Sequence, residues 1–585
     1  MSSGIGMVLS IAKDALAAQQ YGINVTGHNI ANVNTPGYSR QSPVLEAKQP
    51  ELYGGVLLGR GVDTTQVLRV SDQVLESRLM QEKSDMFSFK EMESYMQVFE
   101  GLFNENSESS LSGLIGDFWN LWHDLANNPS GTPERIALYE HSVLLCQQFN
   151  ALDGELSQLN TDLTNALGGG IEKINEITAE IARLNNEIAG QEVDCIANDL
   201  RDQRNTLASE LAEHIDMKIF EQSNGSYTIV SAKGCVLVNQ NESYDLELNG
   251  TAVEWHGSGS TTVDITNYIT NGKLGGWLDM RDEVVAKYQG DLNALAEELI
   301  WTLNQQHSQG VGLTAFSSIT GTYDVSDTGE ALGTVDSGLD YYDKVSDGTF
   351  NVWVYDSNGD VSGSAVITVD ADPGGTTLAS IAADINAVAD INASITTDNK
   401  LQIDADAVNG FTVAFSDDTS NVLAGLGINT FFQGATAGGM GVNDVIGSSK
   451  DHIAAAQIDA SGNFASGDNT NALAMTDLQF ASRSIGLWSC DRREGNTEGT
   501  TTATIEDYYH AMVGSIGIKA ASISSSRAFN EVMVNELKTM RESISGVSLD
   551  EEMTELIKFQ NAFAAAAKLI SVADEMFDTL ISVKQ

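Results

Sequence analysis

Apolar residues recur with a helical period at both ends of the chain. Near the N-terminus they follow steps of three, four and seven residues, at Ile5, Leu9, Ala12, Leu16, Ile23 and Ile30. Near the C-terminus they recur every seven residues, at Leu556, Phe563, Ile570 and Phe577, with Met553, Ala567 and Ile581 at companion positions. This spacing is typical of coiled coils and predicts a helix with a narrow apolar stripe at each end.

Both helices have recognisable boundaries. The first stripe stops at NVNTPGY, residues 32–38, where Asn32 and Asn34 can cap a helix end and Pro36-Gly37 suits the middle of a type II turn. The last helix begins with a capping box, in which Ser548 is the N-cap and Glu551 follows three residues later.

An ordinary core face would give the same stripes, but their position at opposite ends of the chain favours a different interpretation. With every other element between them, they predict that the termini meet as one antiparallel helical pair. Two helices alone bury too little surface to be stable, so we expect further partners, which other copies of the chain would provide.

The middle of the chain alternates between helical and strand patterns. Residues 53–70 predict two short strands around a Gly-Arg-Gly turn, and residues 71–215 predict long helices. Antiparallel strands are expected over 217–271 and a helix over 275–307. Residues 310–450 contain the strand candidates FNVWVYD, SAVITVD, KLQID and GFTVAF around the helical TTLASIAADINAVA, and helix returns after about Thr502.

The sequence therefore predicts a multidomain α+β protein with four parts. These are a terminal α-helical coiled-coil domain made from both chain ends, a long helical rod domain with a small β hairpin, a β-rich domain with one helix, and an inserted, outer, antiparallel β-rich domain. Their predicted boundaries are 1–42 plus 547–585, 43–215 plus 452–546, 216–309, and 310–451, respectively.

Charge is strongly acidic and unevenly placed. The chain has 31 Lys and Arg against 81 Asp and Glu, a formal net charge of -50, which repels nucleic acid and anionic membrane surfaces. Residues 1–40 carry only Lys13, Asp14 and Arg40, whereas residues 310–450 carry 19 acidic residues and three lysines. We expect the nearly neutral N-terminal segment to be the part that can pack at the centre of an assembly.

Neither a secretory signal nor a membrane span is expected. The first residues lack a basic n-region, and their apolar stretch is interrupted by Lys13 and Asp14. We expect no other stretch to be apolar over enough residues to cross a bilayer.

Candidate chemistry is sparse. The sequence contains no HExxH, GxSxG, GxGxxG or GxxxxGK[ST] motif, and its four cysteines form no CxxC pair. His510 follows Glu506 and Asp507 by one helical turn, but no second His or Cys nearby completes a metal site. DSNGD, residues 356–360, lacks the Gly and Glu that a calcium loop needs. We therefore expect no enzyme activity, no metal and no cofactor.

One motif is specific. NIANVNTPGYSRQ, residues 29–41, resembles the signature shared by flagellar rod, hook and hook-associated proteins, and residues 551–583 resemble their closing helix. The motif residues here are Asn29, Asn32, Asn34, Thr35, Pro36, Gly37 and Tyr38. Tyr38-Ser39-Arg40, the long helical region and GDNTNALAMTDLQ at 467–479 resemble the hook-associated members in particular.

The resemblance implies a structural role at the junction of hook and filament, in flagellum assembly and motility. It implies secretion through the flagellar channel to the cell exterior without a cleaved signal peptide, and a short helical ring of copies. The hook protein would lie below, and a second junction protein or the filament above. A cytoplasmic chaperone would cover the C-terminal helix before export.

Subunit contacts are expected at the apolar stripes, namely at Ile5, Leu9, Leu16, Ile23, Ile30, Met553, Leu556, Phe563, Ile570 and Phe577. Two other functions stay open. A hook or distal-rod subunit of the same family would polymerise in many copies, and a surface-displayed adhesin would use the inserted domain.

Overall fold

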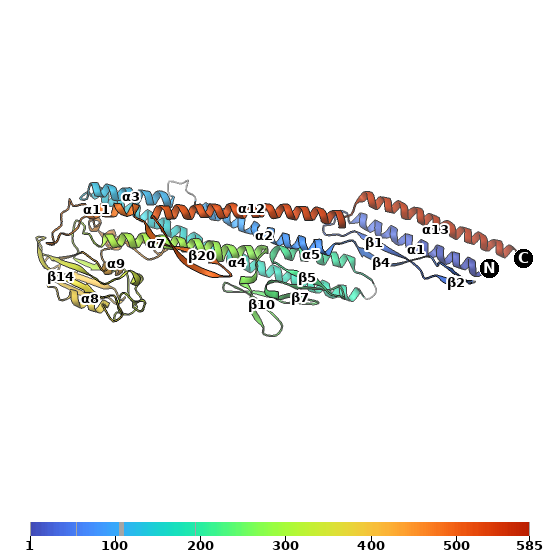
Figure 1. Ribbon diagram of the computed structural model, residues 1–585, viewed down its shortest axis with the longest axis horizontal. Helices are drawn as coiled ribbons and strands as arrows, with labels where there is room; N and C mark the ends of the chain where they lie inside the picture. Colours follow the sequence, from blue (N-terminus) through green and yellow to red (C-terminus); the bar gives the residue numbers. More distant parts are fainter. Residues whose placement is uncertain (1, 54, 104–109, 193–194, 584–585) are drawn as a thin grey trace. The chain divides into compact units, whose positions relative to one another are not determined.

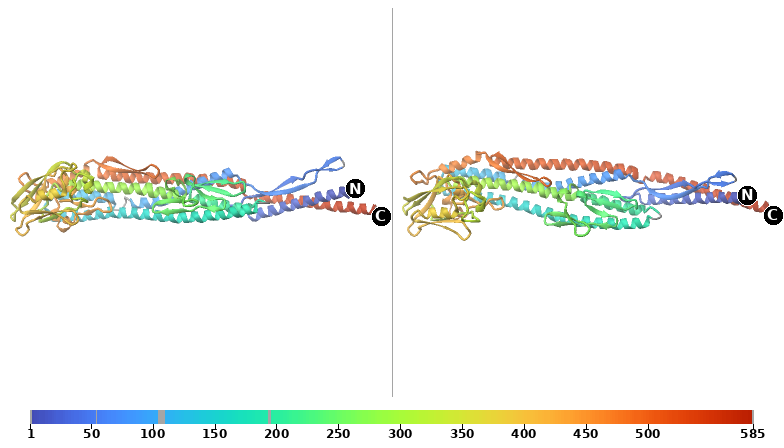
Figure 2. Two further views of the ribbon diagram at one scale, coloured as in Figure 1. Left: turned by 90° about the horizontal axis from the view of Figure 1, so that it is seen from below. Right: turned by 60° about the horizontal axis from the view of Figure 1, so that its bottom comes forward.

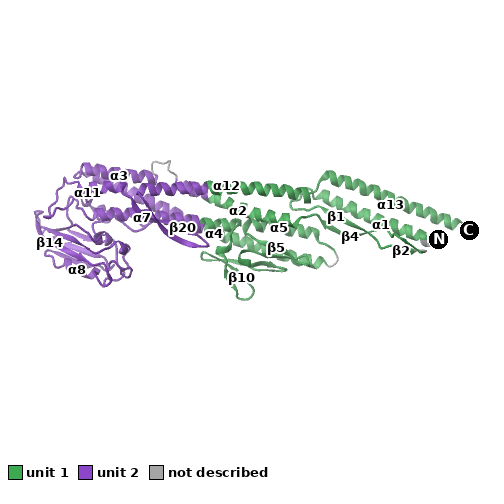
Figure 3. Ribbon diagram, viewed as in Figure 1, with its two compact units in different colours: residues 1–95, 163–280, 521–585 green, residues 96–162, 281–520 purple. Residues whose placement is uncertain are grey.

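The computed structural model describes residues 2–53, 55–103, 110–192 and 195–583 (Figure 1). The chain separates into two compact units (Figure 3). Unit 1 contains residues 1–95, 163–280 and 521–585, and unit 2 contains residues 96–162 and 281–520. The fold is mixed helix and strand, as predicted, while the four finer domain boundaries stay predictions.

The two chain ends form an antiparallel helical pair in unit 1. Helix α1 (Ser2–Ala31) lies along α13 (Leu549–Val583), so that Ile5 lies beside Val572 and Leu580, and Asn29 reaches Glu552 (Figure 1). The predicted pairing of the termini is therefore present. Ser548 acts as the expected N-cap of α13, since the Glu551 backbone N–H donates to its hydroxyl at 3.5 Å.

Small residues make the closest contacts of this pair. Ala12, Ala18, Ala566 and Ala573 are buried, and a Cβ atom added at Gly22 would lie 2.6 Å from the Phe559 ring. The larger residues predicted for the seam are mostly left half-buried or exposed. The pair thus packs through alanine and glycine, and the predicted coiled-coil packing stays a prediction.

A nested β hairpin follows α1. Strand β1 (Gln41–Ala47) pairs with β4 (Val62–Arg69), and β2 (Glu51–Tyr53) pairs with β3 (Val56–Leu58), all antiparallel. The two short strands expected around the Gly-Arg-Gly turn are present as β3 and β4. Each of them pairs with a strand that was not predicted, β2 and β1 respectively, because the ribbon folds back at its far tip.

The remainder of unit 1 is helical with two small sheets. The order β5-β6-β7-β8 forms one antiparallel sheet and β11-β10-β9 the other, which confirms the strands expected over 217–271. Leu79 of α2 packs with Val534 and Leu537 of α12 in a buried cluster. The bounds are α2 (Gln73–Leu102), α4 (Thr132–Gln191), α5 (Asn198–His214), α6 (Gly272–Asp279), α12 (Ile505–Ser545), β5 (Lys218–Glu221), β6 (Tyr227–Val230), β7 (Val236–Asn239), β8 (Glu242–Ser243), β9 (Leu246–Asn249), β10 (Ala252–His256) and β11 (Thr262–Asp264).

Unit 2 is built on helices with an aromatic core. Phe118, Trp119 and Trp122 of α3 (Leu111–Asn127) are fully buried, and rings of Phe431 and Phe432 pack on them. Helix α7 (Ala286–His307) follows a π-helical turn, Met280–Val285, and α11 (Thr470–Asp477) packs on α3.

A long hairpin of unit 2 corrects the sequence prediction. Strands β20 (Arg483–Asp491) and β21 (Gly495–Ala503) pair over nine residues and pack on α7, in a region expected to be helical rod. The reason is local: β21 is mostly Gly and Thr and has no apolar face, so no strand alternation was visible.

The insertion within unit 2 contains two three-stranded antiparallel sheets, β14-β13-β17 and β12-β16-β15. The four strand candidates and the helix are confirmed, whereas the short β12 and β15 were not predicted. The bounds are β12 (Ser318–Thr320), β13 (Gly348–Tyr355), β14 (Val361–Val369), α8 (Leu378–Ile385), β15 (Ile391–Ile395), β16 (Leu401–Ala405), β17 (Thr412–Ser416), α9 (Val422–Gly425), β18 (Phe432–Gln433), β19 (Gly441–Val442) and α10 (Asp444–Ser448).

A buried histidine makes unit 2 sensitive to acid. The His307 Nδ1 lies 2.8 Å from the Asn429 carbonyl oxygen, and the Ala454 backbone N–H donates to Nε2 at 2.9 Å. Complete burial lowers the pKa of His307 to about 4. The ring is therefore neutral in the folded chain, with its proton on Nδ1.

We expect the free energy of unfolding to fall as pH drops from about 6.5 to about 4, because only the unfolded state takes up the His307 proton there. The loss amounts to about 3 kcal/mol. Calorimetric melting of the wild type and His307→Gln across this range tests it, since Gln keeps an amide donor and acceptor but cannot titrate. A pH dependence that is the same in both proteins would refute this assignment.

Candidate assembly site at the base of the terminal helix pair

Asn29 is the hub of a buried polar cluster between α1 and α13. Its side-chain Nδ2 donates to the Gln41 carbonyl oxygen and to Glu552 Oε2, both at 2.9 Å. Its Oδ1 accepts from the Tyr38 hydroxyl at 2.7 Å and from the Gln41 backbone N–H at 3.0 Å. One amide thus fixes the turn after α1 and joins it to α13. We call this cluster, with Arg40, the clasp.

Arg40 completes the clasp on the side of the last helix. Its Nε donates to Glu552 Oε1 at 2.7 Å and its Nη1 to Glu551 Oε2 at 3.0 Å. The Arg40 backbone N–H also donates to the Ser545 carbonyl oxygen at 2.9 Å, at the end of α12. Glu552 is only 2% exposed, and a buried carboxylate needs partners. Arg40 supplies the opposite charge, and Asn29 supplies a further hydrogen bond.

A second set of contacts joins the same turn to α5. The Ser39 backbone N–H donates to Asp202 Oδ2 at 2.9 Å, and Arg69 Nη1 donates to Asp202 Oδ1 at 2.8 Å. Arg541 of α12 donates to the Gly37 carbonyl oxygen at 3.2 Å. The turn is therefore held from α1, α5, α12 and α13 together.

Burial and nearby charges shift the pKa values of Tyr38 and Glu76. Burial raises the pKa of Tyr38, and the nearby carboxylates of Asp199, Asp202 and Glu552 raise it further, so its hydroxyl stays a hydrogen-bond donor. Burial also raises the pKa of Glu76, which accepts from Asn205 Nδ2 at 2.9 Å, while Arg69 and Arg541 oppose that rise.

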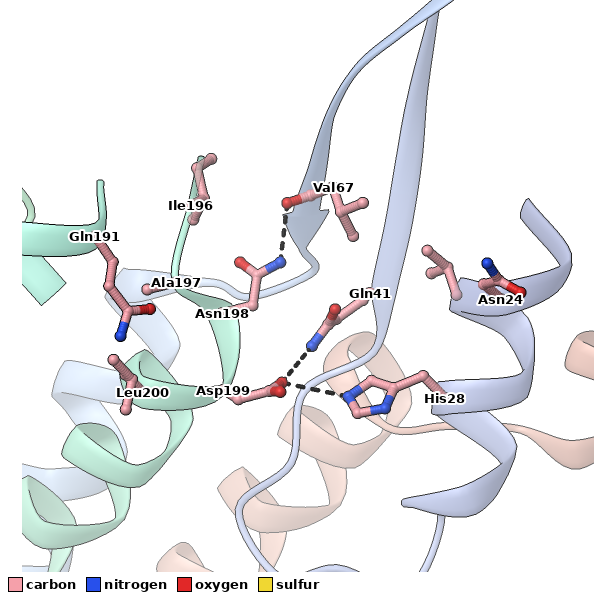
Figure 4. A pocket seen from close by; sticks show the side chains of 11 residues that line it. Asn24, His28, Gln41, Val67, Gln191, Ile196, Ala197, Asn198, Asp199 and Leu200 are labelled. Atoms are coloured by element: carbon pink, nitrogen blue, oxygen red, sulfur yellow. Dashed lines mark hydrogen bonds and ion pairs between the residues drawn. The ribbon is translucent and has the colours of Figure 1, made fainter. Parts of the chain in front are cut away.

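Two clefts flank the turn, and His28 and Asp199 line both. The larger, of about 420 Å³, lies between α1, the base of the hairpin and α5 (Figure 4). There Asp199 accepts from Gln41 Nε2 at 2.8 Å and lies 3.3 Å from His28 Nε2. Pro36 and Thr206 help to line the smaller cleft.

The motif residues divide into two groups in the structure. Asn29, Gly37 and Tyr38 take part in the contacts above, and Asn32 ends α1 by donating to the His28 carbonyl oxygen and accepting from the Thr35 hydroxyl. Asn34 and Pro36 are exposed at the turn. Sequence reasoning missed Arg40 and Glu552 as partners, since nothing in the chain marks a contact across 512 residues.

The predicted subunit-contact residues lie on both sides of the pair. Ile5 is buried; Leu9, Leu16, Ile23, Ile30, Leu556 and Ile570 are partly buried; Met553, Phe563 and Phe577 are exposed. The described residues cover the exposed set only in part. Their role in subunit contact stays a prediction.

Two further surface features concern metal and membrane. Among the described residues, the exposed Asp347, Asp370 and Asp372 have carboxylates close enough together to hold an ion, but no histidine or cysteine joins them. The segment Ile505–Val583 has, by length and composition alone, one stretch apolar enough to span a bilayer. The expectation that no stretch reaches this length was therefore wrong. The segment Ile505–Val583 includes the apolar side chains of α13 that are exposed in the single chain.

Three family models match the chain. Residues 96–320 match "Flagellar hook-associated protein FlgK helical domain", residues 9–38 match "Flagella basal body rod protein", and residues 541–583 match "Flagellar basal body rod FlgEFG protein C-terminal". The first terminal match covers most of α1 and ends at Tyr38 of the clasp, and the second covers the end of α12 and all of α13.

Curated relatives match along their full length. Flagellar hook-associated protein 1 of Escherichia coli (strain K12) is 25% identical, covering 99% of this chain and 100% of the relative. The protein of the same name from Bacillus subtilis (strain 168) is 25% identical, covering 98% of each. A solved structure, the flagellar hook junction protein FlgK from Burkholderia pseudomallei, shares the fold at a TM-score of 0.52 and 17% identity, covering 80% of this chain and 100% of that one.

The paired termini, the clasp motif and these matches define the chain as a structural protein of the bacterial flagellum, of the axial rod and hook class. Within this class, the chain belongs with flagellar hook-associated protein 1, which it matches from end to end.

The clasp can be tested at its hub. Asn29→Ala leaves the Tyr38 hydroxyl, the Gln41 N–H and Glu552 without their shared partner, so we expect the opening free energy of the first turns of α13 to fall by about 2 kcal/mol. Hydrogen exchange at those backbone amides should accelerate about 30-fold. The matched control is Asn34→Ala, an exposed residue of the same motif. Equal exchange rates in the two variants would contradict the hub role.

The turn itself requires glycine at position 37. Gly37 has φ of +82°, and a Cβ there would lie 2.4 Å from Thr206 Oγ1. We expect Gly37→Ala to destabilise unit 1 by about 2 kcal/mol in thermal unfolding. Gly27→Ala, on an open face of α1, should be neutral or slightly stabilising. A Gly37→Ala protein as stable as wild type would show that the turn relaxes freely.

Proposed function

We propose that the chain builds the junction between hook and filament by self-assembly through its terminal helices. One observation carries the proposal. Helix α13 turns Ala566 and Ala573 towards the pair and leaves a series of large apolar side chains exposed. We call these residues the outer face of α13: Met553, Ile557, Phe563, Leu569, Val572, Met576, Phe577 and Ile581.

The outer face is large enough to drive association. Full burial of a large apolar side chain contributes about 1.5–3 kcal/mol relative to exposure, and these side chains are already partly covered. Half of that value, summed over the whole face, gives about 6–12 kcal/mol, which is comparable to the cost of about 4–15 kcal/mol for holding two proteins together. Contact along the length of α13 is therefore needed, as in a packed helical array.

The clasp gives this array a defined geometry. Arg40 and Asn29 hold the start of α13, and Ser545 holds the end of α12 to the same turn. A pair fixed at its base presents its outer face in one orientation to its neighbours. Low charge supports close packing, since residues 1–40 carry only Lys13, Asp14 and Arg40.

The same outer face supports a route of export. An apolar surface of this extent promotes aggregation in the cytoplasm, which favours a chaperone that covers α13 before secretion. We propose that the chain leaves the cell through the flagellar channel without cleavage of its N-terminus, and that its role is structural and not catalytic. Outside, the hook protein would contact it on one side and a second junction protein or the filament on the other.

A hook or distal-rod subunit is the second candidate. The rod-protein matches at residues 9–38 and 541–583 favour it, because they mark features that axial proteins share. The hook-associated match over residues 96–320 favours the junction. Counting copies per flagellum separates the two, since a junction forms one short zone and a hook or rod many turns.

Substitutions on the outer face of α13 test assembly without touching the clasp. We expect Ile557→Ser, Phe563→Ser and Phe577→Ser together to give cells whose hooks lack filaments and whose flagellin is lost to the medium. Electron micrographs and immunoblots of the medium provide the measurement. Val408→Ser, on an exposed loop of unit 2, is the control and should leave filaments intact. Normal filaments on the triple variant would contradict the proposal.

A further inference from the structure

The tip of the nested hairpin is a second uncovered apolar surface of unit 1. Leu52, Val56 and Leu57 are 68%, 60% and 65% exposed, and Leu52 stands opposite Leu57 in the β2 and β3 pairing. Two short strands with apolar side chains in water are not stable by themselves. An exposed apolar cluster of this kind marks a contact surface.

The middle of the hairpin, between the β1–β4 and β2–β3 pairs, is held on α1 on the side away from α13. Lys48 Nζ contacts Asp14 Oδ2 at 2.8 Å, and Gly61 passes so close that a Cβ there would lie 3.4 Å from the Ile11 Cα. Ile5, by contrast, faces α13. Asp14 follows Ile5 by nine residues, about two and a half helical turns, and so projects from the opposite side of α1.

The free end of the hairpin and the end of α13 both lie near the N-terminal end of α1 (Figure 2). The hairpin contacts α1 at Ile11 and Asp14 and extends from there towards the N-terminus, while the end of α13 lies beside Ile5. One chain therefore carries two uncovered apolar surfaces on opposite sides of the same short segment. A neighbouring copy that is rotated about the axis of the pair, with little shift along it, brings one surface against the other.

A groove at the end of α13 can accept such a contact. A mainly apolar groove of about 560 Å³ is lined by Gly4, Ile5, Val572, Glu575, Met576, Thr579 and Leu580. The space beside Gly4 is open, because a Cβ added there would have no neighbouring atom within 4 Å. The groove continues the outer face of α13, which contains Val572 and Met576.

We propose that the hairpin tip of one copy packs into this groove and against the last turns of α13 in the next copy. The proposal rests on the proposed function and names the segments by which neighbouring copies recognise each other. Because the two surfaces differ, the contact is heterologous: each copy uses its tip on one neighbour and its groove on the other. Such contacts produce rings or helical arrays and not closed dimers.

Disulfide trapping in assembled flagella tests the contact. The background carries Cys195→Ser and Cys490→Ser, which removes the two cysteines that are not buried. Leu57→Cys is combined with Met576→Cys, and Leu52→Cys with Leu580→Cys, in cells without the native copy. Purified flagella are oxidised with copper phenanthroline and oxygen, which accept the electrons of the two thiols. We expect a ladder of multimers on non-reducing gels, and monomers from each single-cysteine variant.

The controls separate this proposal from the proposed function. Val408→Cys with Met576→Cys should stay monomeric. Monomers from both test pairs, in flagella that contain the chain at the hook end, would overturn the hairpin contact and leave the junction role intact. Dimers from Leu57→Cys alone would overturn it in favour of a contact between hairpins. Absence of the chain from purified flagella would overturn the junction role itself.

A functional variant gives an independent readout. Replacing Leu52, Val56 and Leu57 by Ser should reduce the fraction of cells with filaments at least about tenfold, because the lost apolar burial suffices for that change in affinity. The exposed positions leave thermal unfolding of the free chain unchanged. The matched control is Val366→Ser with Val408→Ser, two exposed valines of unit 2. Full filament numbers on the hairpin variant would overturn the proposal.

Discussion

The contact of Asn29 and Arg40 with Glu552 is the interaction on which the rest of the assembly surface depends. It joins residues from the two ends of the chain, and it buries a carboxylate that accepts hydrogen bonds from both partners. Removing Arg40 would leave this buried charge without its cation, which is strongly destabilising. A terminal pair held in this way has a fixed base, and the outer face of α13 points in a fixed direction.

Packing through small residues explains how the pair can form within one chain and still expose a large apolar surface. Alanine and glycine let α1 and α13 approach closely, as the short distance from Gly22 to the Phe559 ring shows. The large side chains Phe563 and Phe577 are thereby left for other copies. The contacts within the chain thus combine small residues with a few large ones such as Phe559 and Ile5, while Phe563 and Phe577 stay exposed.

The sequence predicted the terminal pair but not which residues close it. A heptad pattern identifies an apolar stripe, and it contains no information on whether the stripe faces the same chain or a neighbour. The stripe residues Phe563 and Phe577 were predicted to contact neighbouring copies as well as the other terminal helix. In the single chain they are exposed, whereas Ala566 and Ala573 are buried. The clasp motif was visible from resemblance, but the function of Asn29 as a hub needed coordinates, since Glu552 is 523 residues away. The β20 and β21 hairpin was missed because a strand of Gly and Thr has no apolar period.

Accessibility of the outer face of α13 in the free and assembled states tests the central claim most directly. Cysteine placed at Met553 and at Ile581 should react with a maleimide in the free chain and be protected in purified flagella, while cysteine at Val408 should react in both. Equal labelling of the α13 cysteines in the two states would contradict the claim that this face is the contact between subunits.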